Sequence, residues 1–141
     1  MHVCAMMDEV DAAHGIVPRY PGVTSALGCV MADMRHDGVQ TLNAALEALD
    51  IDDLLARIDG LAAACQERLD SAGVAFEGIR ESIELDMLYV GQSHTVRVEI
   101  ARDALTRPGI AAAFELAYRA AFGRSLSGIA VRILNLRYAR I

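Results

Sequence analysis

Apolar residues recur at helical spacing between residues 51 and 72, and this stripe is the clearest pattern along the chain. A spacing of three and four positions is typical of one face of a helix, here of about six turns. Asp50 precedes the stripe as a good N-cap, and Gly73 follows it as a C-terminal stop. A shorter stripe lies between Thr106 and Gly123, with the same two signals. Both segments are predicted to be amphipathic helices.

Between these two segments the apolar period changes to two. Apolar and polar residues alternate over 82–89 and again over 95–100, and the short connection contains Gly91. This pattern predicts an antiparallel hairpin. A run rich in β-branched residues closes the chain over 128–141, and its alternation changes phase near Asn135. The run is predicted to be a strand with a bulge at the phase change.

The beginning of the chain has a different pattern. Its spacing predicts a short helix over 2–13, a brief strand at 16–17, and a second helix that is capped by Thr24 or Ser25 and stops near Arg35.

The order of these elements predicts an α+β fold. A small antiparallel or mixed sheet, made of the hairpin and the C-terminal strand, is expected to pack with the long helix and a second helix. A chain of 141 residues is long enough to bury a core of its own. The stretch 39–42 is too short to assign to an element.

Composition excludes some classes of function. All 13 basic residues are arginine, and the 19 acidic residues leave a net charge of -6 without any block of like charges. This argues against nucleic acid as a primary partner, because binding to phosphates needs clustered cations. No apolar run is long enough to predict a membrane span.

The three cysteines are far apart and odd in number, which does not indicate a disulfide framework. A reducing, cytoplasmic compartment is the simplest interpretation. Cys29 and Cys65 fall on apolar stripes and are expected to be core thiols. His2, Cys4 and His14 lack the paired spacing of a zinc site, so no metal site is expected.

Several segments together resemble a known family. Nearly the whole chain is similar, in order, to the C-terminal part of the hydantoinase A/oxoprolinase family, and the most specific parts are PGVTSALG and YVGQSH. The segments that carry the resemblance are MHVCAMMDEV, VPRYPGVTSALGCVMADMRHD, LYVGQSHTVRV, FELAYRAAFG and GIAVRILNLRYARI.

The resemblance implies a part of a large ATP-dependent enzyme. Members of this family open cyclic amides such as hydantoins or 5-oxoproline, and related subunits serve acetone and acetophenone carboxylases. Their ATPase domain is similar to actin and hexokinase, with Mg²⁺ bridging the phosphates of ATP. The family's phosphate-binding half and Gly-rich adenosine segment are not found in this sequence. This chain alone is therefore expected to hold no cofactor or metal and not to hydrolyse ATP, and its catalytic residues stay unknown.

On this resemblance, residues 1–35 correspond to the terminal helix, strand and helix of the ATPase-like domain. Residues 36–141 correspond to a C-terminal accessory domain. Gly38 stands where the family is expected to have a bulky residue, which weakens the prediction of a strand there. The chain is thus expected to have a structural and subunit-contact role in an ATP-dependent cyclic amide hydrolase.

The implied partners are the ATPase half of the same enzyme and a hydantoinase B-type subunit. Apolar surface on residues 1–35 is expected to favour a homo-oligomer of the isolated chain. The sequence leaves open the substrate, the oligomeric state, and whether the chain is a fragment or a separately encoded subunit.

Two other hypotheses remain. The chain is alternatively a stand-alone interaction or dimerisation module that uses the helix 51–72, whose stripe nearly fits a heptad. A third hypothesis is an independent enzyme, with a polar site that consists of Gln92, Ser93, His94, Asn135 and Arg137. Ser93 and His94 are adjacent, so in an extended strand they face opposite sides and form no dyad without a turn.

The resemblance also suggests candidate functional residues. Tyr89, Gly91 and Gln92 are similar to a signature of the accessory domain at the tip of its sheet. The candidate set, for contact with substrate or partner, consists of Tyr89, Gly91, Gln92, Ser93, Asn135 and Arg137.

Overall fold

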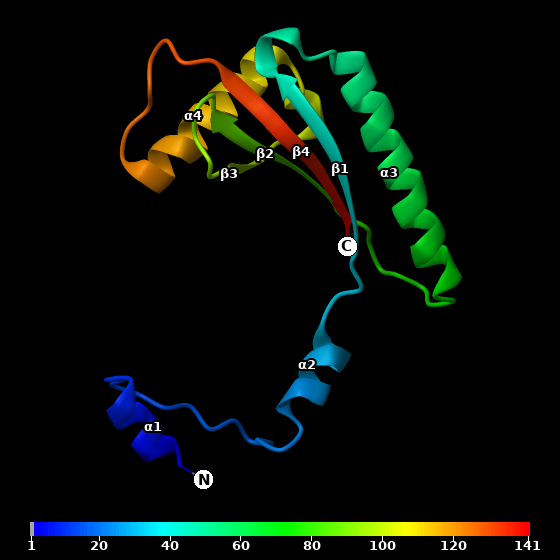
Figure 1. Cartoon of the computed structure of the whole chain (residues 1–141). Helices are drawn as coiled ribbons and strands as arrows, with labels where there is room; N and C mark the ends of the chain where they lie inside the picture. Colours follow the sequence, from blue (N-terminus) through cyan, green and yellow to red (C-terminus); the bar gives the residue numbers. More distant parts are fainter. Residues whose placement is uncertain (1) are drawn as a thin grey trace. The chain divides into compact units, whose positions relative to one another are not determined.

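The computed structural model describes residues 2–141 and divides the chain into two compact units (Figure 1). The first unit ends at Asp33, and the second unit spans Met34–Ile141. Each unit is described by itself.

The first unit contains two short helices, α1 (Val3–Glu9) and α2 (Thr24–Met31). The prediction of a strand at 16–17 is wrong. The backbone there is irregular and is not paired with a strand within this unit. The predicted side-chain cap of α2 is also wrong. Thr24 is the first helical residue, and its hydroxyl donates to the Tyr20 carbonyl at 2.8 Å.

Apolar side chains of the first unit are largely exposed. Neither α1 nor α2 buries any residue, and Val30 and Met31 on α2 are 84% and 75% exposed. Cys29 is exposed on the same helix, so its expected place in a core is wrong. A unit that buries so little apolar surface gains little stability from its own packing.

The second unit is an α+β fold, as predicted. Its antiparallel sheet has the order β1-β4-β2-β3. Two longer helices pack against one face of the sheet, and their buried residues join the inward residues of β2 and β4 in one core cluster (Figure 1). The strands are β1 (His36–Ala45), β2 (Glu81–Tyr89), β3 (Val96–Glu99) and β4 (Val131–Arg140), the helices are α3 (Ile51–Ser71) and α4 (Arg107–Phe122), and the 3-10 helices are η1 (Leu46–Ala48) and η2 (Arg102–Ala104).

Both long helices begin and end where the sequence signals predicted. The Asp50 carboxylate accepts from the backbone N–H groups of residues 52 and 53 at 3.0 and 3.2 Å, and so caps α3. The Thr106 hydroxyl accepts from the Gly109 N–H at 3.1 Å and caps α4. Gly123 ends α4 in the left-handed conformation, with φ of 72°.

The inner face of α3 lies within the core of the chain itself. Leu54, Ile58, Cys65 and Leu69 are buried, as the apolar stripe predicted. The helix 51–72 therefore offers no free apolar stripe for the alternative hypothesis of dimerisation through this helix.

Strand β1 includes the stretch that the sequence left unassigned. Gly38 lies within this strand and does not prevent it. Helix α3 packs closely against Gly38, and a Cβ at this position would lie 2.7 Å from Leu61 Cδ2. The side chain of Leu61 thus occupies the space that a larger residue at position 38 would need.

The predicted bulge in β4 is confirmed. Asp86 pairs with Asn135 while Met87 pairs with Ile133, so Leu134 has no partner on β2. The extra residue shifts the phase of the strand, and Ile133 and Leu136 both reach the core.

Candidate functional site on the polar sheet face

The sheet face opposite the helices carries charged and amide side chains. In β2, residues 83, 85, 87 and 89 point into the core, which places Glu84 and Asp86 on the other face. The register puts Arg97 of β3 and Asn135 of β4 directly beside Asp86, and Arg137 of β4 beside Glu84. We call this set of five residues the polar face.

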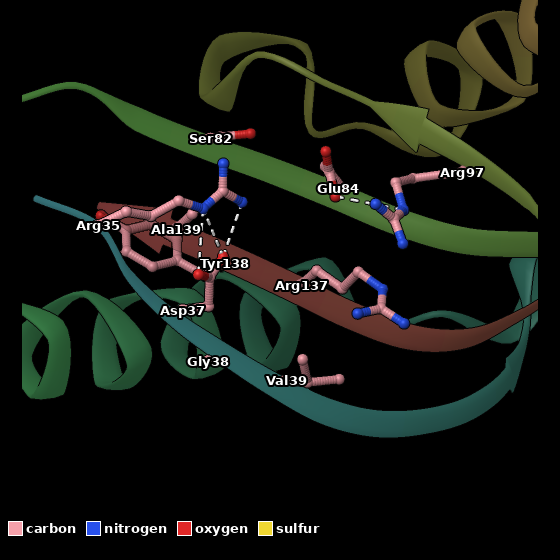
Figure 2. A pocket seen from close by; sticks show the side chains of 10 residues that line it. All are labelled: Arg35, Asp37, Gly38, Val39, Ser82, Glu84, Arg97, Arg137, Tyr138 and Ala139. Atoms are coloured by element: carbon pink, nitrogen blue, oxygen red, sulfur yellow. Dashed lines mark hydrogen bonds and ion pairs between the residues drawn. The ribbon is translucent and has the colours of Figure 1, made fainter. Parts of the chain in front are cut away.

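A pocket of about 140 Å³ extends along this face toward the start of β1 (Figure 2). Arg97, Arg137 and Glu84 line one part of it, and Arg35 and Asp37 line another. The remaining lining comes from Gly38, Val39, Ser82, Tyr138 and Ala139. The pocket thus combines charged groups of both signs with a few small or apolar residues.

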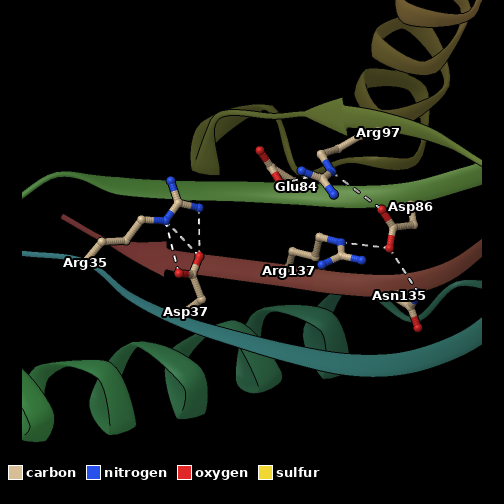
Figure 3. Close-up of polar contacts among 7 residues, drawn as sticks. All are labelled: Arg35, Asp37, Glu84, Asp86, Arg97, Asn135 and Arg137. Carbon is tan, nitrogen blue, oxygen red and sulfur yellow. Dashed lines mark hydrogen bonds and ion pairs between the residues drawn. The ribbon is translucent and has the colours of Figure 1, made fainter. Parts of the chain in front are cut away.

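Asp86 is the buried centre of the polar face, with only 5% of its surface exposed. Its Oδ2 accepts hydrogen bonds from Arg137 Nε at 2.8 Å and from Asn135 Nδ2 at 3.0 Å (Figure 3). A buried carboxylate is costly unless it is paired and hydrogen-bonded, and these two donors meet that requirement. Thr41 donates to Asn135 Oδ1 at 3.2 Å, which fixes the orientation of the amide.

Arg97 approaches the same carboxylate from the other side. Its Nε lies 3.9 Å from Asp86 Oδ1 and 3.5 Å from Glu84 Oε2. Both separations are longer than the 2.7–2.9 Å of a short charge-assisted hydrogen bond. Arg97 is therefore held by two carboxylates without a close bond to either.

A separate ion pair lies at the other part of the pocket. Arg35 donates through Nε and Nη2 to the Asp37 carboxylate, with a shortest distance of 2.7 Å. These hydrogen bonds hold the pKa of Asp37 below its ordinary value. Both side chains are about half exposed, so the pair adds little to stability.

Arg102 connects three elements of the second unit. Its guanidinium donates to Glu81 of β2 at 3.0 Å and to Asp59 of α3 at 2.7 Å. The hydrogen bonds from Arg102 lower the pKa of Glu81. The Tyr138 hydroxyl donates another hydrogen bond to the Glu81 carboxylate, at 3.2 Å. This network joins η2, the sheet and α3.

The hairpin tip is anchored on the aromatic residues of α4. Tyr89 is buried, with its ring 4.9 Å from Phe114 and 4.8 Å from Tyr118 between centroids. Gln92 Nε2 donates to the Tyr118 hydroxyl at 2.7 Å. Gly91 has φ of 97°, a conformation that favours glycine in the turn. These contacts give Tyr89, Gly91 and Gln92 a structural explanation.

Ser93 and His94 lie in the turn rather than in an extended strand. Their side chains are therefore on the same side, with Ser93 Oγ 3.0 Å from His94 Nδ1. Together with Phe122 they line a shallow hollow of about 280 Å³. Both residues are exposed, so nothing in their surroundings excludes water.

The structure separates the sequence-derived candidates into two places. Tyr89, Gly91, Gln92 and Ser93 belong to the hairpin tip, whereas Asn135 and Arg137 lie mid-strand beside Asp86. Sequence reasoning did not single out Asp86, Glu84 or Arg97. These three residues alternate with apolar residues in the two predicted strands. This alternation could have indicated that they share the sheet face opposite the core.

Within residues 2–141, no group of three or more His, Cys, Asp or Glu side chains is arranged to hold a metal ion. The described helices include none that is both long and apolar enough to cross a membrane.

No protein-family model matches the chain. Caprolactamase subunit alpha of Pseudomonas jessenii is 28% identical over 142 residues, which covers 96% of this chain and 20% of that protein. The chain therefore spans about a fifth of the length of this relative.

Two solved structures have a similar fold. The ATP-dependent caprolactamase from Pseudomonas jessenii matches with a TM-score of 0.74 and 24% identity, over 100% of this chain and 21% of that chain. A nucleotide-free acetone carboxylase matches with a TM-score of 0.71 and 21% identity, over 88% of this chain and 19% of that chain. The predicted resemblance to the hydantoinase A/oxoprolinase family is thus confirmed as a partial homology, in sequence to caprolactamase subunit alpha and in fold to caprolactamase and acetone carboxylase.

Proposed function

We propose that this chain is the C-terminal part of an ATP-dependent cyclic amide hydrolase of the hydantoinase/oxoprolinase type. It contributes structure and subunit contacts, and the ATP and Mg²⁺ chemistry lies in the remaining part of the enzyme. The observation that supports this most is the match of 96% of the chain to only 20% of caprolactamase subunit alpha.

The first unit, in this proposal, completes the ATPase-like domain of the enzyme. Its support is the exposed apolar surface of α1 and α2, including Met6, Val30 and Met31. Such a surface is typical of a segment that packs against another part of a protein. The second unit, with its own core, acts as the accessory domain.

The ATPase half of the same enzyme is the first partner in this proposal, and a hydantoinase B-type subunit is the second. Support comes from the related caprolactamase protein, which is itself described as a subunit. The free cysteines Cys4, Cys29 and Cys65 fit a reducing compartment, and we place the enzyme in the cytoplasm.

Co-expression tests this proposal. The tagged partner is caprolactamase subunit alpha from which the segment matching this chain has been removed. We expect the untagged chain to copurify with it, and the double variant V30D/M31D to copurify much less, because charges would replace the apolar contact surface. Equal recovery of the chain from a tag-only control would contradict the proposal.

A further inference from the structure

We propose that Arg97 and Arg137 form a binding site for a carboxylate on the polar face. The ligand is a carboxylate on a short aliphatic stem, supplied either by a small organic acid or by a glutamate side chain. This site lies wholly within the second unit. It would exist whether or not the chain completes an ATPase-like domain.

The two guanidinium groups converge although their strands are not neighbours. Strands β3 and β4 flank β2, so their backbones are roughly 9–10 Å apart. Both side chains nevertheless reach the Asp86 carboxylate, Arg137 at Oδ2 and Arg97 at Oδ1 (Figure 3). Asp86 therefore acts as a positioning residue that brings two cations to one place.

The geometry leaves the binding edges of both groups available. Their contacts with the described residues run through Nε, at 2.8 Å for Arg137 and at 3.5 Å or more for Arg97. Among residues 2–141, no hydrogen bond joins the terminal nitrogens of either guanidinium to the protein. A guanidinium presents several N–H donors in a plane, which matches the two oxygens of a carboxylate.

Solvent reaches this place. The Arg97 and Arg137 side chains are 58% and 35% exposed, and both line the pocket of about 140 Å³. Val39 lies opposite Arg137 on β1 and adds apolar lining beside its side chain (Figure 2). Apolar contact of this kind suits an aliphatic stem, and the small volume suits a ligand of side-chain size.

Glu84 is the internal competitor of the proposed ligand. Its carboxylate lies 3.5 Å from Arg97 Nε and is 21% exposed, so a bound carboxylate would share Arg97 with it. Removing the charge at position 84 should therefore strengthen binding, whereas removing the charge at position 97 should weaken it. A general attraction of anions to the protein would weaken similarly when any arginine charge is removed, so an arginine outside the pocket is needed as the control.

The test is an NMR titration of the full chain in which the Nε–Hε signals of arginine are followed. Sodium acetate, butyrate and amide-capped N-acetylglutamate are the probes, each compared with an equal concentration of sodium chloride. We expect saturable shifts of the Arg97 and Arg137 signals. Arg97→Gln should weaken binding about fivefold, and Glu84→Gln should strengthen it about twofold or more.

The variants and probes separate the outcomes. Arg132 lies on β4, the strand of Arg137, but outside the pocket. The variant Arg132→Gln therefore removes one arginine charge as a matched control and should leave binding unchanged. Tighter binding of capped glutamate than of butyrate would support the site with a protein side chain as its source, and the reverse would support a free acid. Shifts that do not saturate, or that R97Q and E84Q leave unaltered while both variants keep the wild-type fold, would overturn the proposal.

Discussion

Arg137 Nε donates a 2.8 Å hydrogen bond to Oδ2 of Asp86, joining opposite charges on the two central strands of the sheet. Because Asp86 is buried, the loss of its partner leaves a poorly solvated carboxylate. We expect Arg137→Met to lower the free energy of unfolding by about 2–4 kcal/mol, somewhat less than for a fully buried pair because Arg97 and Asn135 remain.

Urea denaturation of a double-mutant cycle measures this relationship. Asp86→Asn combined with Arg137→Met should recover part of the stability that R137M alone loses, because the unpaired charge is then absent. Additive losses in the double variant would contradict the coupling.

A second prediction concerns the pH dependence of stability. Arg102 holds the pKa of Glu81 below the ordinary value of 4.5, so the folded state favours ionised Glu81 more than the unfolded chain does. The resulting stability is present above pH 4.5 and is lost as the pH falls through the lower pKa of the folded state. We therefore expect the urea concentration at the unfolding midpoint to decrease as the pH is lowered below 4.5.

The variant Glu81→Gln should lose less stability than the wild type over the same fall in pH. Solvent screening limits the effect, because the Glu81 and Arg102 side chains are more than a third exposed. Asp103→Asn, a neighbouring acidic position, is the control. Identical pH profiles for E81Q and the wild type would count against a role for the Arg102 contact.

A third prediction tests the anchoring of the hairpin tip. Gln92→Ala removes the 2.7 Å hydrogen bond to the Tyr118 hydroxyl and should cost roughly 1 kcal/mol in thermal or urea unfolding. Tyr118→Phe should cost a similar amount, and the double variant little more than either. Ser93→Ala, at the exposed position beside Gln92, should have almost no effect. A strictly additive double variant would show that the two side chains do not cooperate.

The long helices were predictable because their signals are local. Asp50 and Thr106 cap their own helices, and each apolar stripe has the helical period. Strand β1 was not predictable in this way. It lies at the sheet edge, contains Gly38, and depends on pairing with β4, which is nearly a hundred positions away in the sequence.

The polar face could be predicted only in part. Alternation placed Glu84 and Asp86 on one face, but it does not give the strand order. Only the insertion of β4 next to β2 brings Arg137 and Asn135 to Asp86. Ser93 and His94 show the opposite case. Adjacent side chains in an extended strand point to opposite sides, but these two residues lie in a turn, which brings their side chains together.

A fourth prediction concerns self-association through the first unit. The isolated chain should form oligomers in sedimentation velocity, because α2 exposes Val30 and Met31. The V30D/M31D variant should shift the distribution toward monomer. Leu116→Asp is a matched control, because Leu116 is 74% exposed but lies on α4 of the second unit. Dissociation by L116D, and none by V30D/M31D, would place the contact on the second unit instead.

The most direct test of the proposed function is ATP hydrolysis, measured for the purified chain alone and for its complex with the caprolactamase subunit alpha that lacks the matching segment. We predict background turnover for the chain alone and for the truncated subunit alone, and ATP hydrolysis coupled to ring opening of a cyclic amide when both are present with any further subunit of that enzyme. ATP turnover above background by the chain alone would contradict the account.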